Sequence, residues 1–150
     1  MRLPAGSTGF DAPPVDAAAH RRAFLTACHH AARAIGGRVA GIEGPGVTPN
    51  FHLAEIAHRD GRLSVLGHGC VLFAAIAGPR PWRDLRPTFA DDPAVAAAIV
   101  AASALRPLAV AELSTPLDQA DLSALGPGEH RQIAYWKPDT VGELLFNYWD

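Results

Sequence analysis

The sequence predicts an α+β domain with an antiparallel sheet of about four strands and helices packed mainly on one face. Three observations predict this fold. Asp60-Gly61 separates two apolar runs and is typical of a two-residue β-hairpin loop. Residues 17–35 and 93–104 have helical periodicity, and each segment follows an aspartate that can cap a helix. The final stretch, residues 130–150, joins a helix start to a cluster of aromatic side chains.

Length and composition predict a single domain over residues 1–150. The chain has 150 residues, of which 49% are hydrophobic and 19% charged, as is ordinary for a globular protein. The opening MRLPAGSTGF has no apolar signal region, and the apolar stretch Val65–Ala77 is too short to cross a bilayer. Two cysteines, Cys28 and Cys70, do not make a disulfide framework. We therefore expect a cytoplasmic protein without membrane association.

The first third of the chain predicts an arm, a helix and a strand. Residues 1–15 hold three prolines and several small residues, which favour a loose N-terminal arm. Asp16 can cap a helix over 17–35 that ends at Gly36-Gly37. The short apolar run 38–43 is consistent with a strand. The expected inward positions of the helix are Phe24, Cys28, Ala31 and Ile35.

The hairpin signal is the clearest β feature. Phe51–His58 and Leu63–Ala77 flank Asp60-Gly61, which predicts that Ile56 pairs with Val65 and His52 with Gly69. The second run is apolar on both faces, so we expect a long strand in the centre of the sheet.

Prolines and capping aspartates mark the loops and helix ends between residues 78 and 138. Gly78–Pro87 is a proline-rich loop, and Asp92 and Pro93 start the helix over 93–104, with Val95, Ile99 and Ala102 facing inward. The segments after it are predicted as a short strand over Leu108–Leu113, a turn or short helix over Leu117–Leu125, and a helix over Pro127–Trp136 that Pro138 ends.

The C-terminal residues predict an aromatic helix docked on the core. Thr140 can cap the first turn, and Glu143 can reach back to the N–H of Thr140 in a capping box. Apolar residues recur at helical spacing over 141–149. Burial of each large aromatic removes about 150–250 Å² at about 25 cal/mol per Å². We therefore expect this helix to be a main source of stability.

Seven histidines raise the question of a metal site. Zinc needs three or four ligands that converge from suitable faces. In the predicted hairpin, His52 and His58 share a face but lie about 20 Å apart at roughly 3.3 Å per residue. His68 points to the opposite face. The pattern predicts no metal and no cofactor.

One face of the hairpin offers a candidate catalytic arrangement. Glu55, His68 and Cys70 share that face in the predicted register, and a base, an orienting group and a thiol are the parts of a nucleophilic site. A solvated polar face of a strand pair accounts for the same residues. A small enzyme that uses Glu55, His68 and Cys70 therefore stays an alternative function.

Two patches are candidates for partner binding. The loop before residue 87 combines a tryptophan with arginines, the residue types enriched in binding hot spots, and the outer side of the last helix carries a polar stripe. The loop also suits a tryptophan that covers the core edge, and the stripe suits an ordinary solvated surface. The candidate residues are Arg80, Trp82, Arg83, Arg86, Glu143, Asn147 and Asp150.

Charge is distributed unevenly along the chain. Residues 112–150 hold two basic and seven acidic side chains, a net of −5, whereas residues 1–111 hold eleven basic and eight acidic side chains, a net of +3. An acidic surface attracts a basic partner and raises encounter rates, although a solvated acidic face explains the same count. The sequence pI of about 6.4 argues against nucleic acid as the partner.

The run Gln132–Asp150, QIAYWKPDTVGELLFNYWD, resembles the C-terminal signature of small bacterial immunity proteins of polymorphic toxin systems. The shared features are a tryptophan–basic–proline step, a TVGE-like cap and an FNxWD-like end. The resemblance implies a protein that neutralises a cognate toxin by protein–protein occlusion and performs no chemistry. The alternatives are the small enzyme described above and a structural subunit of a larger assembly.

Overall fold

The computed structural model describes residues 1–45, 49–79 and 86–149. These residues form one five-stranded sheet in which sequence order is also spatial order. The first four strands are antiparallel, and β5 runs parallel to β4. The α+β prediction is confirmed, although the sheet is mixed and has one strand more than expected. The strands are β1 (Arg38–Glu43), β2 (Phe51–His58), β3 (Gly61–His68), β4 (Phe73–Ala77) and β5 (Arg106–Pro107).

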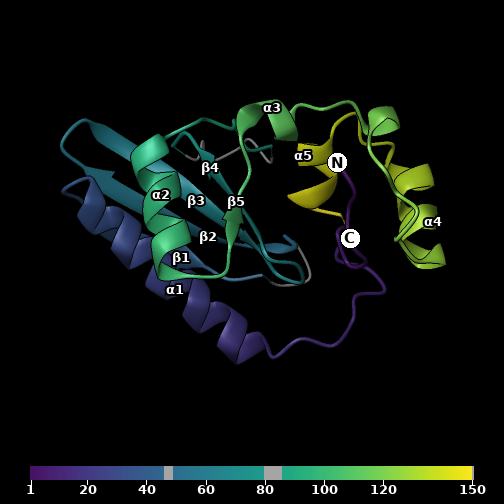
Figure 1. Ribbon diagram of the computed structural model, residues 1–150, viewed down its shortest axis with the longest axis horizontal. Coiled ribbons are helices and arrows are strands. Elements are labelled where there is room, and N and C mark those ends of the chain that lie inside the picture. The colour runs from purple at the N-terminus through teal and green to yellow at the C-terminus, as the bar shows by residue number, and fades with distance from the viewer. Residues whose placement is uncertain (46–48, 80–85, 150) are drawn as a thin grey trace.

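Helices cover both faces of this sheet (Figure 1). Helices α1 and α2 pack together on one face of the sheet. The opposite face is covered by α3, α5 and the N-terminal residues. The expectation of helices mainly on one face is therefore wrong. The central strand is buried along most of its length on both sides, so each face needs its own layer. The helices are α1 (Ala17–Ala34), α2 (Pro93–Ala102), α3 (Val110–Leu113), α4 (Pro127–Trp136) and α5 (Val141–Leu145), with a 3₁₀ turn at Leu117–Gln119.

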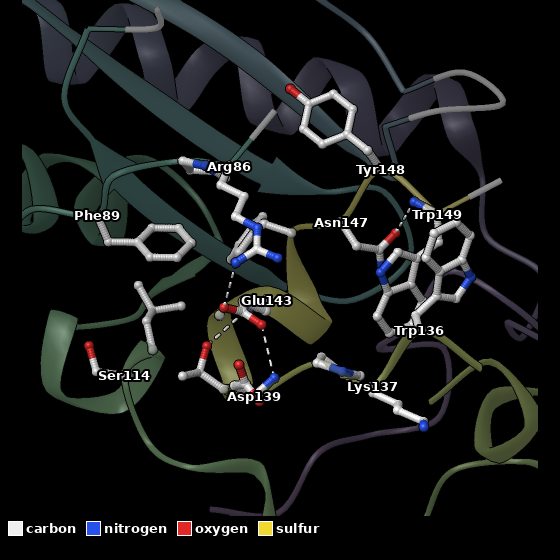
Figure 2. Close-up of a pocket in the computed structure, with 16 residues that line it drawn as sticks. Arg86, Phe89, Ser114, Trp136, Lys137, Asp139, Glu143, Asn147, Tyr148 and Trp149 are labelled. Atoms are coloured by element: carbon white, nitrogen blue, oxygen red, sulfur yellow. Dashed lines mark hydrogen bonds and ion pairs between the residues drawn. The ribbon is translucent and has the colours of Figure 1, made fainter. Parts of the chain in front are cut away.

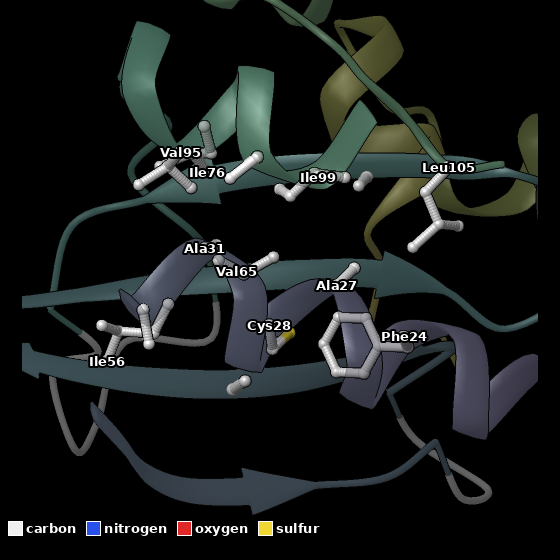
Figure 3. Packing of buried hydrophobic residues seen from close by; sticks show 14 of the residues in the cluster. Phe24, Ala27, Cys28, Ala31, Ile56, Val65, Ile76, Val95, Ile99 and Leu105 are labelled. Carbon is white, nitrogen blue, oxygen red and sulfur yellow. The ribbon is translucent and has the colours of Figure 1, made fainter. Parts of the chain in front are cut away.

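Aliphatic and small side chains fill the layer between α1, α2 and the sheet (Figure 3). Phe24 of α1 lies directly on β3, where a Cβ added to Gly67 would sit 2.4 Å from its ring. The caps predicted from sequence are present: Asp16 accepts from the Ala19 N–H at 3.0 Å, and Asp92 accepts from the Val95 N–H at 3.1 Å.

Among the helices of the described residues, none has the length and apolar character needed to span a membrane.

The hairpin forms with a register two residues away from the predicted one. His58 pairs with Gly61, so the loop is Arg59-Asp60, and Gly61 has the positive φ of +131°. A shift of two keeps every side chain on its predicted face, because strand side chains alternate with period two. The predicted long strand is also divided in two, since His68 Nδ1 accepts from the N–H groups of Cys70 and Val71 at 3.0 and 3.2 Å and turns the chain.

The segment over residues 108–113 contains a helix rather than the predicted strand. Two carboxylates organise the start of α3: Asp91 accepts from the Val110 N–H at 2.9 Å, and Glu112 accepts from the Ala109 N–H at 3.1 Å. These caps satisfy backbone donors that a strand would have needed a neighbour to satisfy. The helix predicted over Pro127–Trp136 is present as α4, at the edge of the molecule in Figure 1.

The N-terminal residues 2–10, which we call the strap, differ from the expected loose arm. Leu3, Ser7 and Thr8 have no exposed surface, whereas residues 11–15 are mostly exposed. Glu129 of α4 is also fully buried and explains the order of the strap. Its carboxylate accepts from the N–H groups of Gly6, Thr8 and Gly126 at 3.1 Å and from the Thr8 hydroxyl at 2.8 Å. The small residues Gly6 and Thr8, which predicted a loose arm, instead allow the backbone to pack closely around the Glu129 carboxylate.

The terminal helix is shorter than predicted, since α5 ends at Leu145. Asn50, just before β2, provides the reason: its Oδ1 accepts from the Asn147 N–H and its Nδ2 donates to the Leu145 carbonyl, both at 3.0 Å. Asn147 Nδ2 donates to the carbonyls of Leu144 and Thr8 at 2.8 and 3.1 Å. These side chains take the backbone groups that a further helical turn would use.

The strap predicts a large stability effect at Glu129. Glu129→Gln replaces one acceptor oxygen by a donor and removes the charge, which leaves buried N–H groups without full partners. We expect the free energy of unfolding to fall by about 2–4 kcal/mol in a urea titration. The exposed Asp118→Asn is the matched control and should change it by less than about 0.5 kcal/mol. An equally small effect of Glu129→Gln would contradict the role given to this carboxylate.

Candidate functional site

A pocket of about 410 Å³ opens between the link from α4 to α5, the end of the chain and the segment that precedes α2 (Figure 2). Its volume lies within the range of about 300–1,000 Å³ that is usual for ligand pockets. The side chains of Phe89, Trp136, Phe146, Tyr148 and Trp149 form its aromatic wall. Charged and polar groups stand at the rim, so the pocket joins an apolar surface to a few fixed polar contacts.

Two tryptophans form the outer part of the wall. The rings of Trp136 and Trp149 stack with centroids 6.1 Å apart and planes only 3° apart. Trp136 remains 38% exposed, and its indole N–H donates to the Gln132 side chain at 3.1 Å. The expectation that the terminal aromatics all serve the core is therefore only partly met. Phe146 is buried against Phe51 and also lines the pocket. Trp149 is partly buried against the same hydrophobic cluster, and Trp136 is the more exposed member of the pair.

Glu143 is the fixed charged group of the pocket. Thr140 caps α5 by accepting from the Glu143 N–H at 3.2 Å, as predicted. The Glu143 carboxylate accepts from the N–H of Asp139 at 2.9 Å, one residue before the expected partner. Its other oxygen meets Arg86 at 3.4 Å, in an ion pair whose arginine side chain is 80% exposed. Such exposed pairs contribute about 0–1 kcal/mol, so Arg86 is held weakly by this contact.

Three of the seven predicted partner-binding residues line the pocket: Arg86, Glu143 and Asn147. Asn147 does not belong to a solvent-facing stripe as predicted, because its side chain is buried and bonded to the strap. The other four lie outside the described residues, namely Arg80, Trp82, Arg83 and Asp150.

Residues 112–150 have a net charge of −5, but several of their acidic side chains are buried or paired within the chain. Glu129 is buried in the strap, and Glu112 forms an ion pair with Arg106. Asp121 approaches Arg2 at 3.9 Å in an exposed pair. Part of the negative charge counted in the sequence is therefore already matched within the chain.

The structure does not assemble the alternative catalytic arrangement. Glu55 pairs with Ser64 while His68 pairs with Phe51, so the two functional side chains are four residues apart along the strands, or about 13 Å. Glu55 instead faces Arg62 at 3.4 Å. Burial raises the pKa of Cys70, with a further rise from Glu129, which disfavours the reactive thiolate.

His68 acts as a structural histidine. Its side chain is fully buried, and its Nε2 lies 2.8 Å from the Ser7 carbonyl oxygen in the strap. Nδ1 accepts hydrogen bonds from two backbone N–H groups, so the ring proton is on Nε2. The Nε2–H donates a hydrogen bond to the Ser7 carbonyl oxygen. Burial lowers the pKa of His68 to about 4, so the ring is neutral at pH 7. Within the described residues, no group of three or more metal-ligating side chains comes together.

Comparison with known proteins found no match to a family model, to a curated protein or to a solved structure.

The pocket itself is a feature that sequence reasoning missed, because the helical spacing of residues 141–149 assigned both Tyr148 and Trp149 to a buried face. The available signal was Asn147, since asparagine favours helix ends and competes for backbone groups.

Buried neutral histidines predict that the protein loses stability in mild acid. Burial, followed by the charges of His20 and Arg21, also lowers the pKa of His52 to about 4. The unfolded chain binds protons near pH 6.5, so it takes up more protons than the native state between pH 6.5 and 4. Stability is therefore complete above pH 6.5 and falls as the pH is lowered through this window, by on the order of 3 kcal/mol for His68 alone.

This dependence is measured as the free energy of unfolding in urea at a series of pH values. His68→Gln should reduce the slope between pH 6.5 and 4 by about one proton, whereas the exposed His29→Gln should leave it unchanged. A wild-type protein with equal stability at pH 7 and pH 4.5 would disprove the neutral, buried state of these rings.

Proposed function

We propose that this protein is an immunity-type binding protein that neutralises a cognate bacterial toxin by covering its active site. One observation supports the proposal most: the stretch that resembles immunity proteins, Gln132–Asp150, also supplies most of an open aromatic pocket. In this role the chain contributes a recognition surface and performs no reaction on its partner.

The pocket has the properties of a binding hot spot. Tryptophan and arginine are enriched among residues whose truncation costs the most binding energy, and Trp136, Trp149 and Arg86 all line this pocket. Tyr135, which is 76% exposed, extends the aromatic surface beside Trp136. Large exposed aromatics at a concave site favour contact with a partner over contact with water.

The walls are held in place before any partner arrives. The Trp149 N–H donates to Asn147 Oδ1 at 3.2 Å, and Asn147 is itself fixed by Asn50 and the strap. On the other side, the cap of α5 orients Glu143. A preorganised surface loses less conformational entropy on binding, which favours a tight complex.

A stable interface of this kind buries roughly 1,600 Å² in total. The pocket alone is too small to supply that area, so we expect it to be the centre of a wider contact. The exposed parts of α4 and the rim around Arg86 surround it.

The direct test is whether the chain captures the product of the gene beside its own and neutralises it. Trp136→Ala and Trp149→Ala should each weaken the complex by about 30-fold or more in a titration, as hot-spot truncations of about 2 kcal/mol do. Val100→Ala is the control, since Val100 is an exposed apolar residue on α2 and belongs to the opposite layer.

The same variants should fail to protect cells that produce the toxin, while the Val100→Ala variant protects. Undiminished binding by both tryptophan variants would show that the interface lies elsewhere. If the neighbouring product is neither bound nor neutralised, the proposed function is wrong.

A further inference from the structure

We infer that the pocket recognises the guanidinium group of an arginine on the partner. This incoming guanidinium takes the place of the Arg86 guanidinium at the Glu143 carboxylate. This inference rests on the proposed function, because it names the group of the toxin that enters the site. Its basis is a guanidinium already present there: Arg86 extends into the pocket and meets the Glu143 carboxylate (Figure 2).

The Glu143 carboxylate is positioned to receive a second cation. The Asp139 N–H holds one oxygen, and the cap by Thr140 fixes the first turn of α5. A carboxylate offers about four lone-pair positions, so the hydrogen bond to Asp139 leaves acceptor capacity for a forked guanidinium. The side chain of Glu143 is 30% exposed, so a partner can reach it from solvent.

The aromatic wall favours arginine over lysine. A planar guanidinium stacks on indole and phenyl rings, and the ammonium group of lysine is a compact, strongly hydrated charge. Trp136, Trp149 and Phe89 line the same pocket as Glu143. Lys137 also lines it, but its side chain extends away from Glu143 in Figure 2, so it does not occupy the place of an incoming cation.

The resident ion pair between Arg86 and Glu143 is open to solvent. The Arg86 side chain is 80% exposed, and solvent screens its attraction to Glu143. A partner arginine that enters with its surrounding surface excludes that solvent and strengthens the contact.

The test uses N-acetyl-arginine methylamide as the probe and the citrulline analogue, which is neutral and nearly isosteric, as its control. Binding is followed by the indole N–H signals of Trp136 and Trp149 in NMR titrations. We expect saturable shifts with the arginine probe and at least a fivefold weaker response with citrulline. Arg86→Gln removes the resident competitor and should tighten arginine binding severalfold.

Glu143→Gln keeps an acceptor for the Asp139 N–H but removes the charge, so it should abolish the preference for arginine. Glu112→Gln, which breaks an ion pair with Arg106 outside the pocket, should leave the preference intact. Equal binding of the two probes, or weaker arginine binding by Arg86→Gln, would overturn the inference.

The two proposals fail in different ways. If the probes discriminate but the product of the neighbouring gene is not captured, the pocket chemistry stands and the proposed function falls. If the toxin is captured with the same affinity by Glu143→Gln and the probes do not discriminate, the function stands and the guanidinium site falls.

Discussion

A buried polar network between the two chain ends determines the shape of the half of the protein that carries the pocket. Glu129 receives four donors from the strap and from the start of α4, and His68 donates to the strap from the sheet. Asn147 joins the C-terminal segment to Thr8. A buried polar group that loses its partner is costly, so the loss of one of these contacts weakens the hold on both chain ends. The apolar layers stabilise the sheet, and the network decides where the chain ends lie on it.

The pocket follows from this constraint. Asn50 ends α5 by taking the backbone groups of Leu145 and Asn147, and the residues beyond leave the helical path. Had the helix continued as the apolar spacing predicts, Trp149 would lie on its buried face. The turn instead stacks Trp149 on Trp136 and leaves it partly buried against the hydrophobic cluster. A structural asparagine pair thus produces the exposed aromatic surface on which the proposed recognition depends.

Local signals predicted much of the fold, and distant partners account for the rest. The caps at Asp16, Asp92 and Thr140, the ends of α4 and the faces of the hairpin depend on residues within a few positions of one another, and each is present. The strap and the end of α5 depend on hydrogen bonds across 121 and 97 residues, which no local pattern encodes. The register shift of two also has a nonlocal consequence, since it separates Glu55 from His68 while it preserves their face.

Native-state hydrogen exchange measured residue by residue tests the central claim, that the polar network fixes both chain ends. The amides of Thr8 and Asn147 donate to Glu129 and Asn50, so they should exchange about as slowly as Val65 in the centre of the sheet, because only global unfolding exposes them. Exchange of Thr8 and Asn147 at rates typical of frayed termini, with Val65 still protected, would contradict this account.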